Sequence, residues 1–304
     1  MITELLNISS EVKEALEEKL PIVALESTVI SHGLEYPFNL EAAEKVEAAV
    51  RKSGAVPAFI AILNGQIKIG CSQADLQFLA SSKQIRKVSV RDLPIVISQK
   101  SNGATTVAAT SLIAHKAGIE IFSTGGIGGV HRNSLFDISA DLPVLSKTPI
   151  TVVCSGAKAI LDLNATRECL ETNGVTVVGY KCDEFPAFYT RKSGLSVDHR
   201  ADSIEEISEL IKTRDSLGLN SAVLVTVPIP KEFELENTKL ERLMELAFNL
   251  AQRNEIKGKE ITPFLLKQLS ELTEGKSVKA NIALLENNAR TAGKIATMLS
   301  KVSK

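Results

Sequence analysis

Short apolar segments alternate with longer amphipathic ones along most of this chain, and this alternation constrains the fold more than any other feature. The short segments are rich in Val and Ile and too short for ordinary helices, which is typical of β-strands. We expect strands at Ile22–Leu25, Phe59–Leu63, Gln66–Ile69, Ile95–Ser98, Ile121–Ser123, Thr151–Cys154, Thr176–Tyr180 and Ala222–Val227.

Between these strands, apolar residues recur at spacings of three and four residues, as on one face of a helix. The expected helices are Asn39–Ser53, Thr105–Ala117, Ala157–Thr172 and Ile204–Gly218. Only helical patterns follow in the last part of the chain, at Leu240–Arg253, Thr262–Leu272 and Val278–Leu299. The alternation predicts an α/β fold with helices on both faces of a central sheet, and a helical C-terminal part packed onto it.

The sequence contains no mark of a boundary between domains: no Gly/Ser- or Pro-rich linker, no low-complexity segment and no repeat. We therefore expect one domain over residues 1–304, with 1–20 as an N-terminal helical extension. This extension is acidic and amphipathic, unlike a signal peptide. No apolar run reaches the roughly 18–20 residues of a membrane span. We expect a cytoplasmic protein that does not bind membranes.

Charge and composition exclude several classes of function. The net charge is -1 and there is no dense Lys/Arg block, which argues against binding of a nucleic-acid polymer but leaves a small anionic ligand open. The four cysteines lie far apart and the four histidines lack zinc spacing, so buried free thiols are expected rather than zinc or disulfides. The absence of a GxSxG motif argues against a serine hydrolase.

The stretch from Ser123 to Arg132 reads STGGIGGVHR and follows an expected strand. Glycine lets backbone amides approach an anion closely, and α/β proteins place ligand loops at such strand ends. The stretch is neither GxGxxG nor a P-loop. It indicates either an anion-binding loop or a tight turn that needs positive φ angles.

Two charged residues follow expected buried strands. Lys158 is expected in the first turn of a helix, where the helix dipole disfavours a second positive charge and so favours a neutral, nucleophilic amine. Glu26 directly follows Ile22–Leu25, where apolar surroundings favour a protonated carboxyl that can act as an acid. The alternatives are a solvated surface lysine and a carboxylate that caps a turn.

Three further segments carry polar or aromatic side chains. Asp137 and Asp141 flank Ser139, which suits either a hard divalent cation or a pair of turn caps. The segment Asp183–Tyr189 concentrates aromatics in a chain with 4% aromatic residues, as a base-stacking loop or a packing loop would. Asn281 is expected to open a helix, where its amide would read a nucleobase edge or cap the helix.

Taken in order, these segments resemble the pseudouridine-5'-phosphate glycosidases, the family that includes the indigoidine synthase A-like proteins. The resemblance spans about residues 20 to 300. It rests on the motifs at Ala24–Leu34, Lys87–Ser89, Arg91–Pro94, Asn102–Val107, Gly125–Arg132, Phe136–Leu142, Cys154–Lys158, Asp183–Tyr189 and Asn281–Leu284.

The resemblance implies reversible cleavage of the C–C glycosidic bond of pseudouridine 5'-phosphate to uracil and ribose 5-phosphate. Such a bond lacks the nitrogen leaving group of ordinary nucleosides. By resemblance, Lys158 adds at C1' while Glu26 protonates the ring oxygen, and uracil departs from the lysine-linked, ring-opened ribose. The family also implies a three-layer α/β/α fold around a mostly parallel or mixed sheet, and a homotrimer.

The same resemblance implies the other site residues. Asp137 is expected to bind one Mn²⁺ together with waters. The residues expected to contact substrate are Lys87, Val107 through its backbone, Ser139, Ala140 and Asp141, with His131 and Asn281 near the uracil. The chain departs from the family pattern in two places: Val90 replaces an expected arginine, and the link between His131 and Phe136 is about two residues short.

Two other functions are compatible with these residues. A Schiff-base aldolase or lyase acting on another sugar phosphate would keep Lys158 and the anion loop, but would not need a uracil site near Asn281. A non-catalytic sugar-phosphate or nucleotide binder would use Lys158 only to pair with phosphate.

Overall fold

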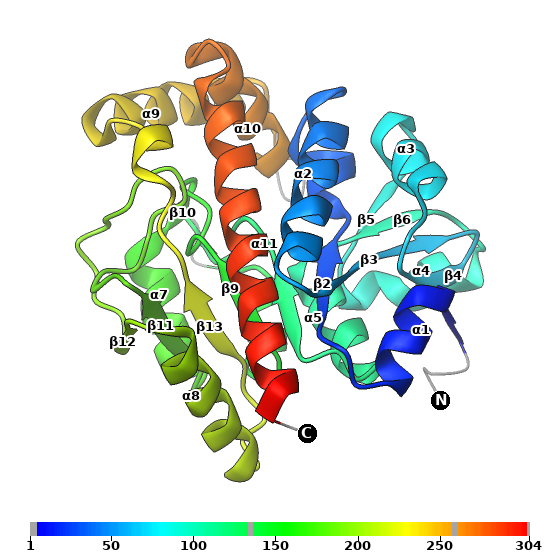
Figure 1. Ribbon diagram of the computed structural model, residues 1–304. Helices are drawn as coiled ribbons and strands as arrows, with labels where there is room; N and C mark the ends of the chain where they lie inside the picture. The colour runs from blue at the N-terminus through cyan, green and yellow to red at the C-terminus, as the bar shows by residue number, and fades with distance from the viewer. Residues whose placement is uncertain (1–4, 133–135, 257–260, 303–304) are drawn as a thin grey trace.

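A mixed β-sheet runs through the middle of the protein (Figure 1). The computed structural model describes residues 5–132, 136–256 and 261–302. Over these residues the sheet has the order β1-β4-β3-β2-β7-β9-β13-β11-β12, and β6, which also pairs with β5, joins it at β3. Its strands are β1 Leu6–Ile8, β2 Ile22–Glu26, β3 Val56–Leu63, β4 Gln66–Ile69, β5 Arg86–Val88, β6 Gly103–Thr105, β7 Ile121–Ser123, β9 Thr151–Cys154, β11 Thr176–Tyr180, β12 His199–Ala201 and β13 Val223–Thr226.

The central strands are parallel. From β3 through β2, β7, β9, β13 and β11 to β12, each strand runs parallel to the next, whereas β4 and β6 pair antiparallel with β3. Every residue of β2, β9 and β13 is buried. Parallel strands covered on both faces read as continuous apolar runs, and the expected mostly parallel or mixed sheet is confirmed.

Helices cover both faces of the sheet. On one face, in front in Figure 1, α2 (Phe38–Lys52) lies beside α11 (Lys276–Val302), which crosses β2, β7 and β9. On the other face α5 (Val107–Lys116) packs against β2, β3 and β7. The other α-helices of the described residues are α1 Ser10–Glu17, α3 Gln73–Ser81, α4 Leu93–Ser98, α6 Asp141–Leu145, α7 Leu163–Thr172, α8 Ile204–Ser216, α9 Asn237–Arg253 and α10 Ile261–Leu272.

One expected strand is wrong. Ile95–Ser98 belongs to the helix α4. Pro94 lies in the first turn of α4, where its missing N–H is not needed and its fixed φ suits a helix. Leu93 and Val96, three residues apart, are the buried positions, so the apolar run follows a helical period rather than a strand.

Several short strands had no recognisable signal in the sequence. β5, β6 and β12 have three residues each, and the two-residue strands β8 (Val130–His131) and β10 (Leu161–Asp162) pair antiparallel. The expected N-terminal helical extension is helical only at α1. It is preceded by β1, which pairs parallel with β4 and so extends the sheet. Residues 1–4 lie outside the described part of the chain.

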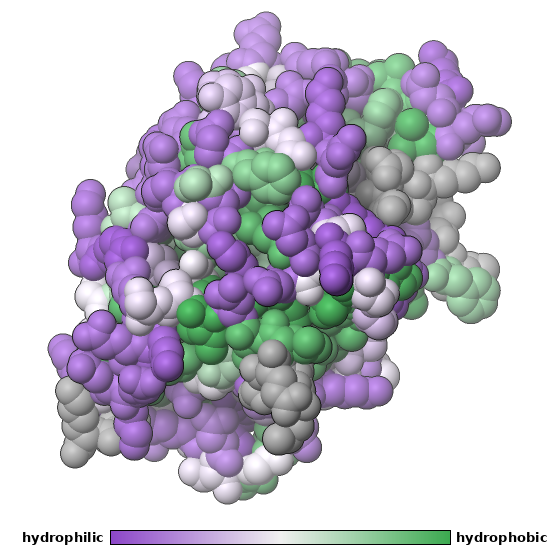
Figure 2. All heavy atoms as spheres, turned by 90° about the vertical axis from the view of Figure 1, so that its right-hand side faces the viewer, coloured by the Kyte–Doolittle hydropathy of each residue, from purple (hydrophilic) through white to green (hydrophobic). Residues whose placement is uncertain are grey.

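Apolar side chains also reach the surface. Figure 2 shows them gathered between polar ones on the side that faces right in Figure 1, where α3 and α4 lie. Phe78 of α3 and Ile95 of α4 are more than a third exposed, at 41% and 38%. Among the described helices, none combines the length and the apolar character needed to cross a lipid bilayer.

The glycine between β9 and Lys158 gives a test of this packing. Gly156 has a φ of +79°, and an added Cβ would lie 1.9 Å from the carbonyl oxygen of Pro186. Gly156→Ala should lower the free energy of unfolding by about 3 kcal/mol or more, because left-handed strain adds to overpacking. Urea unfolding measures this loss.

Gly174 is the matched control. Its φ is +68°, but an added Cβ would meet no atom of the described residues within 4 Å. Gly174→Ala should therefore lower stability only by the strain of a left-handed alanine, about 1–2 kcal/mol. Equal losses in the two variants would contradict the close approach of Pro186.

Candidate active site

The parallel strands end at one edge of the sheet, and the expected site residues follow these ends. Glu26 is the last residue of β2, Thr124 follows β7, and Lys158 follows β9 by four residues. In open α/β sheets ligands bind at this carboxyl edge. A small cavity of about 40 Å³ opens there, and its lining includes Glu26, Lys87, Thr124, Lys158, Phe188 and Asn281. Four of the residues expected in the site thus face one pocket.

Glu26 is buried in this pocket, with 6% of its surface exposed. Its Oε1 accepts a hydrogen bond from the hydroxyl of Thr124. Burial raises the pKa of the Glu26 carboxyl, because water no longer solvates the charged form. Lys158 and the Thr124 hydrogen bond oppose the increase, Asp141 adds to it, and Lys87 opposes it. The role of Glu26 as an acid stays a prediction.

Lys158 does not lie on a helix. The helix α7 begins at Leu163 with Asp162 as its N-cap, so the helix-dipole argument for Lys158 was wrong. The backbone of Lys158 is instead held by the glycine-rich stretch: its N–H donates to the carbonyl of Ile127 at 3.1 Å, and the Ile127 N–H donates to Gly156 at 3.0 Å. The side chain is half-buried and lines the same pocket as Glu26.

The glycine-rich stretch is a close-packed segment. Gly125, Gly126, Gly128 and Gly129 all have ordinary φ values, so a turn with positive φ is wrong for them. They are glycines because neighbours approach closely. A Cβ on Gly128 would lie 2.3 Å from Ser139 Oγ, and one on Gly126 would lie 2.7 Å from the ring of Phe188.

Asp141 ties this stretch to α5. Its Oδ2 accepts the N–H of Gly128 at 2.7 Å, and its Oδ1 accepts the N–H of Ala108, in the first turn of α5, at 2.9 Å. Asp141 is 4% exposed. Both oxygens therefore hold backbone in place beside Val107, the first residue of α5. Contact of Asp141 and Val107 with a substrate stays a prediction.

His131 and Asp137 form the outer part of the site. The His131 N–H donates to the carbonyl of Asp137 at 2.9 Å. Burial lowers the pKa of His131, Asp137 opposes this, and Lys87 and Lys158 reinforce it. His131, Asp137 and the two lysines are therefore close enough to interact electrostatically. Residues 133–135, which form the short link, lie outside the described residues.

Asn281 lies inside a helix and does not open one. It is the sixth residue of α11, so its interpretation as a helix cap was wrong. Its side chain is 3% exposed and borders the pocket. Within the described part of the chain, its Oδ1 has no hydrogen-bond partner. A buried acceptor without a partner in the pocket is suited to a ligand N–H group.

Comparison with known proteins gives one consistent result. The model of the family described as indigoidine synthase A like protein matches residues 11–298. Proteins named pseudouridine-5'-phosphate glycosidase from Caldanaerobacter subterraneus and Petrotoga mobilis are 54% and 52% identical, covering 98% and 97% of both chains. This chain belongs to the indigoidine synthase A-like family.

Two solved structures have a fold similar to that of this chain. An indigoidine synthase A-like protein from Thermotoga maritima is 38% identical, with a TM-score of 0.89 over 97% of this chain and 96% of the other. The prealnumycin C-glycosynthase AlnA, in complex with ribulose 5-phosphate, is also 38% identical, with a TM-score of 0.90 over 98% of both chains.

The described residues contain no cage of three or more metal-binding side chains. Among them, no group of three or more His, Cys, Asp or Glu side chains could hold a metal. Asp137 is half-buried and lies beside His131. Mg²⁺ and similar hard cations are often held by one or two carboxylates and several waters, so Asp137 fits that kind of site and not a closed protein cage.

The aromatic segment after β11 divides between packing and the pocket. Phe185 and Tyr189 are buried in the core, which is the packing interpretation. Phe188 borders the pocket and meets Tyr189 edge-on, with ring centroids 4.8 Å apart. Of these three aromatic residues, only Phe188 lines the pocket.

Sequence reasoning missed two buried polar residues that support the site. In the sequence, Thr124 belongs to the glycine-rich stretch and carries no mark of a separate role, and no motif marks Asn288. Asn288 lies seven residues after Asn281, on the same face of α11, and this heptad spacing was the signal that could have identified it.

The raised pKa of Glu26 predicts how stability depends on pH. Between the unfolded and the folded pKa, the folded protein binds the proton more tightly, so its stability falls as pH rises through this window. Glu26→Gln removes the ionisation. We expect the variant and the wild type to have the same free energy of unfolding near pH 4. At pH 8 the variant should be more stable by an amount on the order of 1 kcal/mol, measured by thermal unfolding.

Glu41→Gln is the control, because Glu41 forms an exposed ion pair with Lys45. It should change stability by less than about 0.5 kcal/mol at either pH. A Glu26→Gln protein that is less stable than the wild type at pH 8 would show that the carboxylate is well compensated in its ionised form.

Proposed function

We propose that this protein reversibly cleaves the C–C glycosidic bond of pseudouridine 5'-phosphate, giving uracil and ribose 5-phosphate. The observation that carries the proposal is the pocket shared by Glu26, Lys158 and Asn281. In this proposal they act as the acid, the nucleophile and the amide that reads the base. The relatives named pseudouridine-5'-phosphate glycosidase match nearly the whole chain at about half identity, which supports the same reaction here.

The covalent step assigns separate roles to Lys158 and Glu26. The neutral amine of Lys158 forms a bond to C1' as the bond from C1' to the ring oxygen breaks, and Glu26 gives its proton to that oxygen. The ammonium formed by this attack loses a proton and uracil C5 takes one up. The freed nitrogen lone pair then forms an iminium with C1' as the bond from C1' to C5 breaks, with its electrons leaving on uracil. Water adds to the iminium and releases ribose 5-phosphate and the free lysine.

The rest of the site recognises the two ends of the substrate. Lys87 and the amide of Val107, at the N-terminus of the ten-residue helix α5, suit the 5'-phosphate. Asn281 faces the pocket with a buried carbonyl oxygen that accepts a ring N–H of uracil. Ser139, Ala140, Asp141 and His131 complete the substrate contacts.

We further propose that Asp137 holds one Mn²⁺ whose other ligands are waters. When bound, this ion supplies a hard positive charge next to the anionic substrate. A cation held at Asp137 would lie near His131, whose backbone N–H donates to the Asp137 carbonyl.

The resemblance also suggests a cytoplasmic homotrimer built from one domain. The exposed apolar area around α3 and α4 supports self-association, because such areas on soluble proteins commonly mark protein–protein interfaces (Figure 2). A second copy of this chain is the partner we propose for it.

Reductive trapping tests the role of Lys158. With ribose 5-phosphate and borohydride, the wild type should gain the mass of one ribose phosphate less one oxygen, located on Lys158. Lys158→Arg keeps the charge but cannot form an imine, so it should lose both the adduct and, by about a thousandfold or more, uracil release. Mass spectrometry and the absorbance of released uracil measure the two effects.

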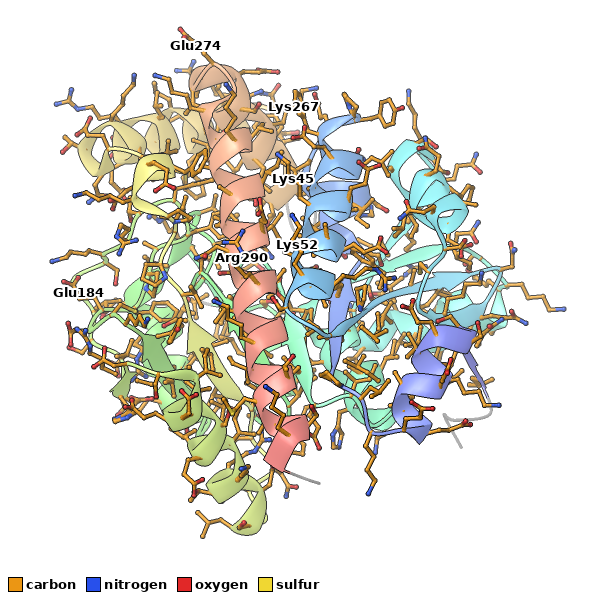
Figure 3. The ribbon with its side chains drawn as sticks, in the orientation of Figure 1. Lys45, Lys52, Glu184, Lys267, Glu274 and Arg290 are labelled. Carbon is orange, nitrogen blue, oxygen red and sulfur yellow. The ribbon has the colours of Figure 1, made fainter. Side chains whose placement is uncertain are left out.

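Lys45→Arg, on the exposed face of α2, is the control and should keep the adduct and the turnover (Figure 3). An adduct that forms without release of uracil from pseudouridine 5'-phosphate would favour an aldolase or lyase of another sugar phosphate. The absence of any adduct on Lys158 would refute the covalent mechanism and favour a non-catalytic binder.

Asn281→Ala separates base recognition from the covalent step. The variant should form the ribose adduct on Lys158 within about twofold of the wild type. Its uracil release should fall roughly 10–100-fold, because a buried hydrogen bond to the base, of about 1–3 kcal/mol, is lost. Asn287→Ala is the control, since Asn287 lies on the same helix as Asn281 but donates its amide to the Pro228 carbonyl. Parallel loss of adduct and release would contradict a base-specific role.

A further inference from the structure

A fully buried asparagine of α11 joins the ends of two strands. Asn288 has no exposed surface. Its Nδ2 donates to the carbonyl of Thr124 at 2.9 Å, and its Oδ1 accepts from the hydroxyl of Ser155 at 3.2 Å. Thr124 follows β7 and Ser155 follows β9, so one amide bridges both ends. A buried amide with both functions satisfied fixes its neighbours strongly.

One partner of Asn288 leads directly to Glu26. Thr124 donates its N–H to Val153 at 3.0 Å, accepts from Asn288 through its carbonyl, and donates its hydroxyl to the Glu26 carboxylate. All three polar groups of Thr124 are therefore used. The Asn288 amide helps to set the position from which the Thr124 hydroxyl reaches Glu26.

The other partner leads to Lys158. Ser155 is three residues before Lys158, and its N–H donates to the carbonyl of Gly125 at 2.8 Å. The Nδ2 of Asn288 also lies 3.4 Å from that carbonyl. The side chain of Asn288 thus connects the segment of Thr124 to the segment of Lys158, and it connects both segments to α11.

The same helix carries Asn281, two turns earlier. Seven residues span about 10.5 Å and return almost to the same face of a helix. Between the two asparagines, Leu284 and Leu285 pack against Gly125, where an added Cβ would lie 3.3 and 3.2 Å from them. Arg290, two residues after Asn288, comes off the outer side of α11 and pairs with Glu286 at 2.5 Å (Figure 3). The inner face of α11 is therefore fixed in both register and rotation.

We propose that Asn288 is a positioning residue: it locks α11 to the ends of β7 and β9 and so holds Asn281 over the pocket and Thr124 against Glu26. It touches neither substrate nor reacting atoms. The proposal rests on the proposed function for its kinetic consequences, but its structural consequence is independent of any reaction.

The kinetic test compares Asn288→Leu, which keeps the approximate size, with Asn288→Ala, which avoids a bulky apolar group. Turnover of pseudouridine 5'-phosphate should fall at least about tenfold in both, since small misplacements of reacting groups are costly. Asn287→Leu, the neighbour whose amide bonds only to Pro228 among the described residues, should stay within about twofold of the wild type.

The pH profile distinguishes positioning from a merely structural role. The charged groups that face Glu26 are Lys158, Lys87 and Asp141, and none of them is changed. Without the Asn288 amide, the Thr124 hydroxyl no longer donates to the Glu26 carboxylate. Glu26 then stays protonated to higher pH, and the alkaline limb of the kcat/KM profile moves to higher pH. Thr124→Val should move it equally, and the Thr124→Val/Asn288→Leu double variant should move it no further.

Crystal structures of the wild type and the Asn288 variants give the readout that needs no turnover. We expect the spacing between Asn281 Oδ1 and Lys158 Nζ to change by about 1 Å, enough to impair catalysis. An unchanged spacing together with an unmoved limb overturns the proposal. If the wild type does not turn over pseudouridine 5'-phosphate, the proposed function fails, and the spacing alone decides the role of Asn288.

Discussion

The hydrogen bond from the Thr124 hydroxyl to the buried Glu26 carboxylate joins the ends of two neighbouring parallel strands, and the other parts of the site are arranged around it. Burial raises the pKa of the Glu26 carboxyl and so favours its protonated form. The hydroxyl and the nearby Lys158 favour the ionised form. An acid that gives up a proton and later regains it must be able to adopt both its protonated and its ionised form. The opposing effects on the pKa of Glu26 favour one form each.

The backbone around this bond is held by groups that a substrate does not need to touch. Asp141 accepts hydrogen bonds from the backbone amides of Gly128 and Ala108 through its two carboxylate oxygens. Ser139 leaves no room for a side chain at Gly128. The Gly128 amide of the glycine-rich stretch is therefore already bound within the protein. In the proposed function, recognition of the phosphate therefore depends on Lys87 and the start of α5 rather than on the glycine-rich stretch.

The sequence was informative where a residue's chemistry follows directly from its place on a strand. Buried parallel strands read as unbroken apolar runs, so the positions of Glu26 and Lys158 at strand ends were predictable. The sequence was misleading at Ile95–Ser98, where a short apolar run fits both a strand and a helix. It was also misleading at Lys158, because the helix expected to carry this residue begins only at Leu163. The family resemblance assigned roles that no single motif could assign.

What could not be predicted depends on contacts between distant parts of the chain. Asn288 and Thr124 are 164 residues apart, and neither belongs to a motif that marks a polar side chain as buried and paired. The contact matters for the proposed reaction, in which the covalent chemistry comes from the ends of β2 and β9 and the amide that faces the base comes from α11. A helix that slid or rotated by a fraction of a turn would leave the nucleophile intact and move the base-reading group away. The bridging amide of Asn288 is the physical reason why these two halves of the site keep a fixed distance.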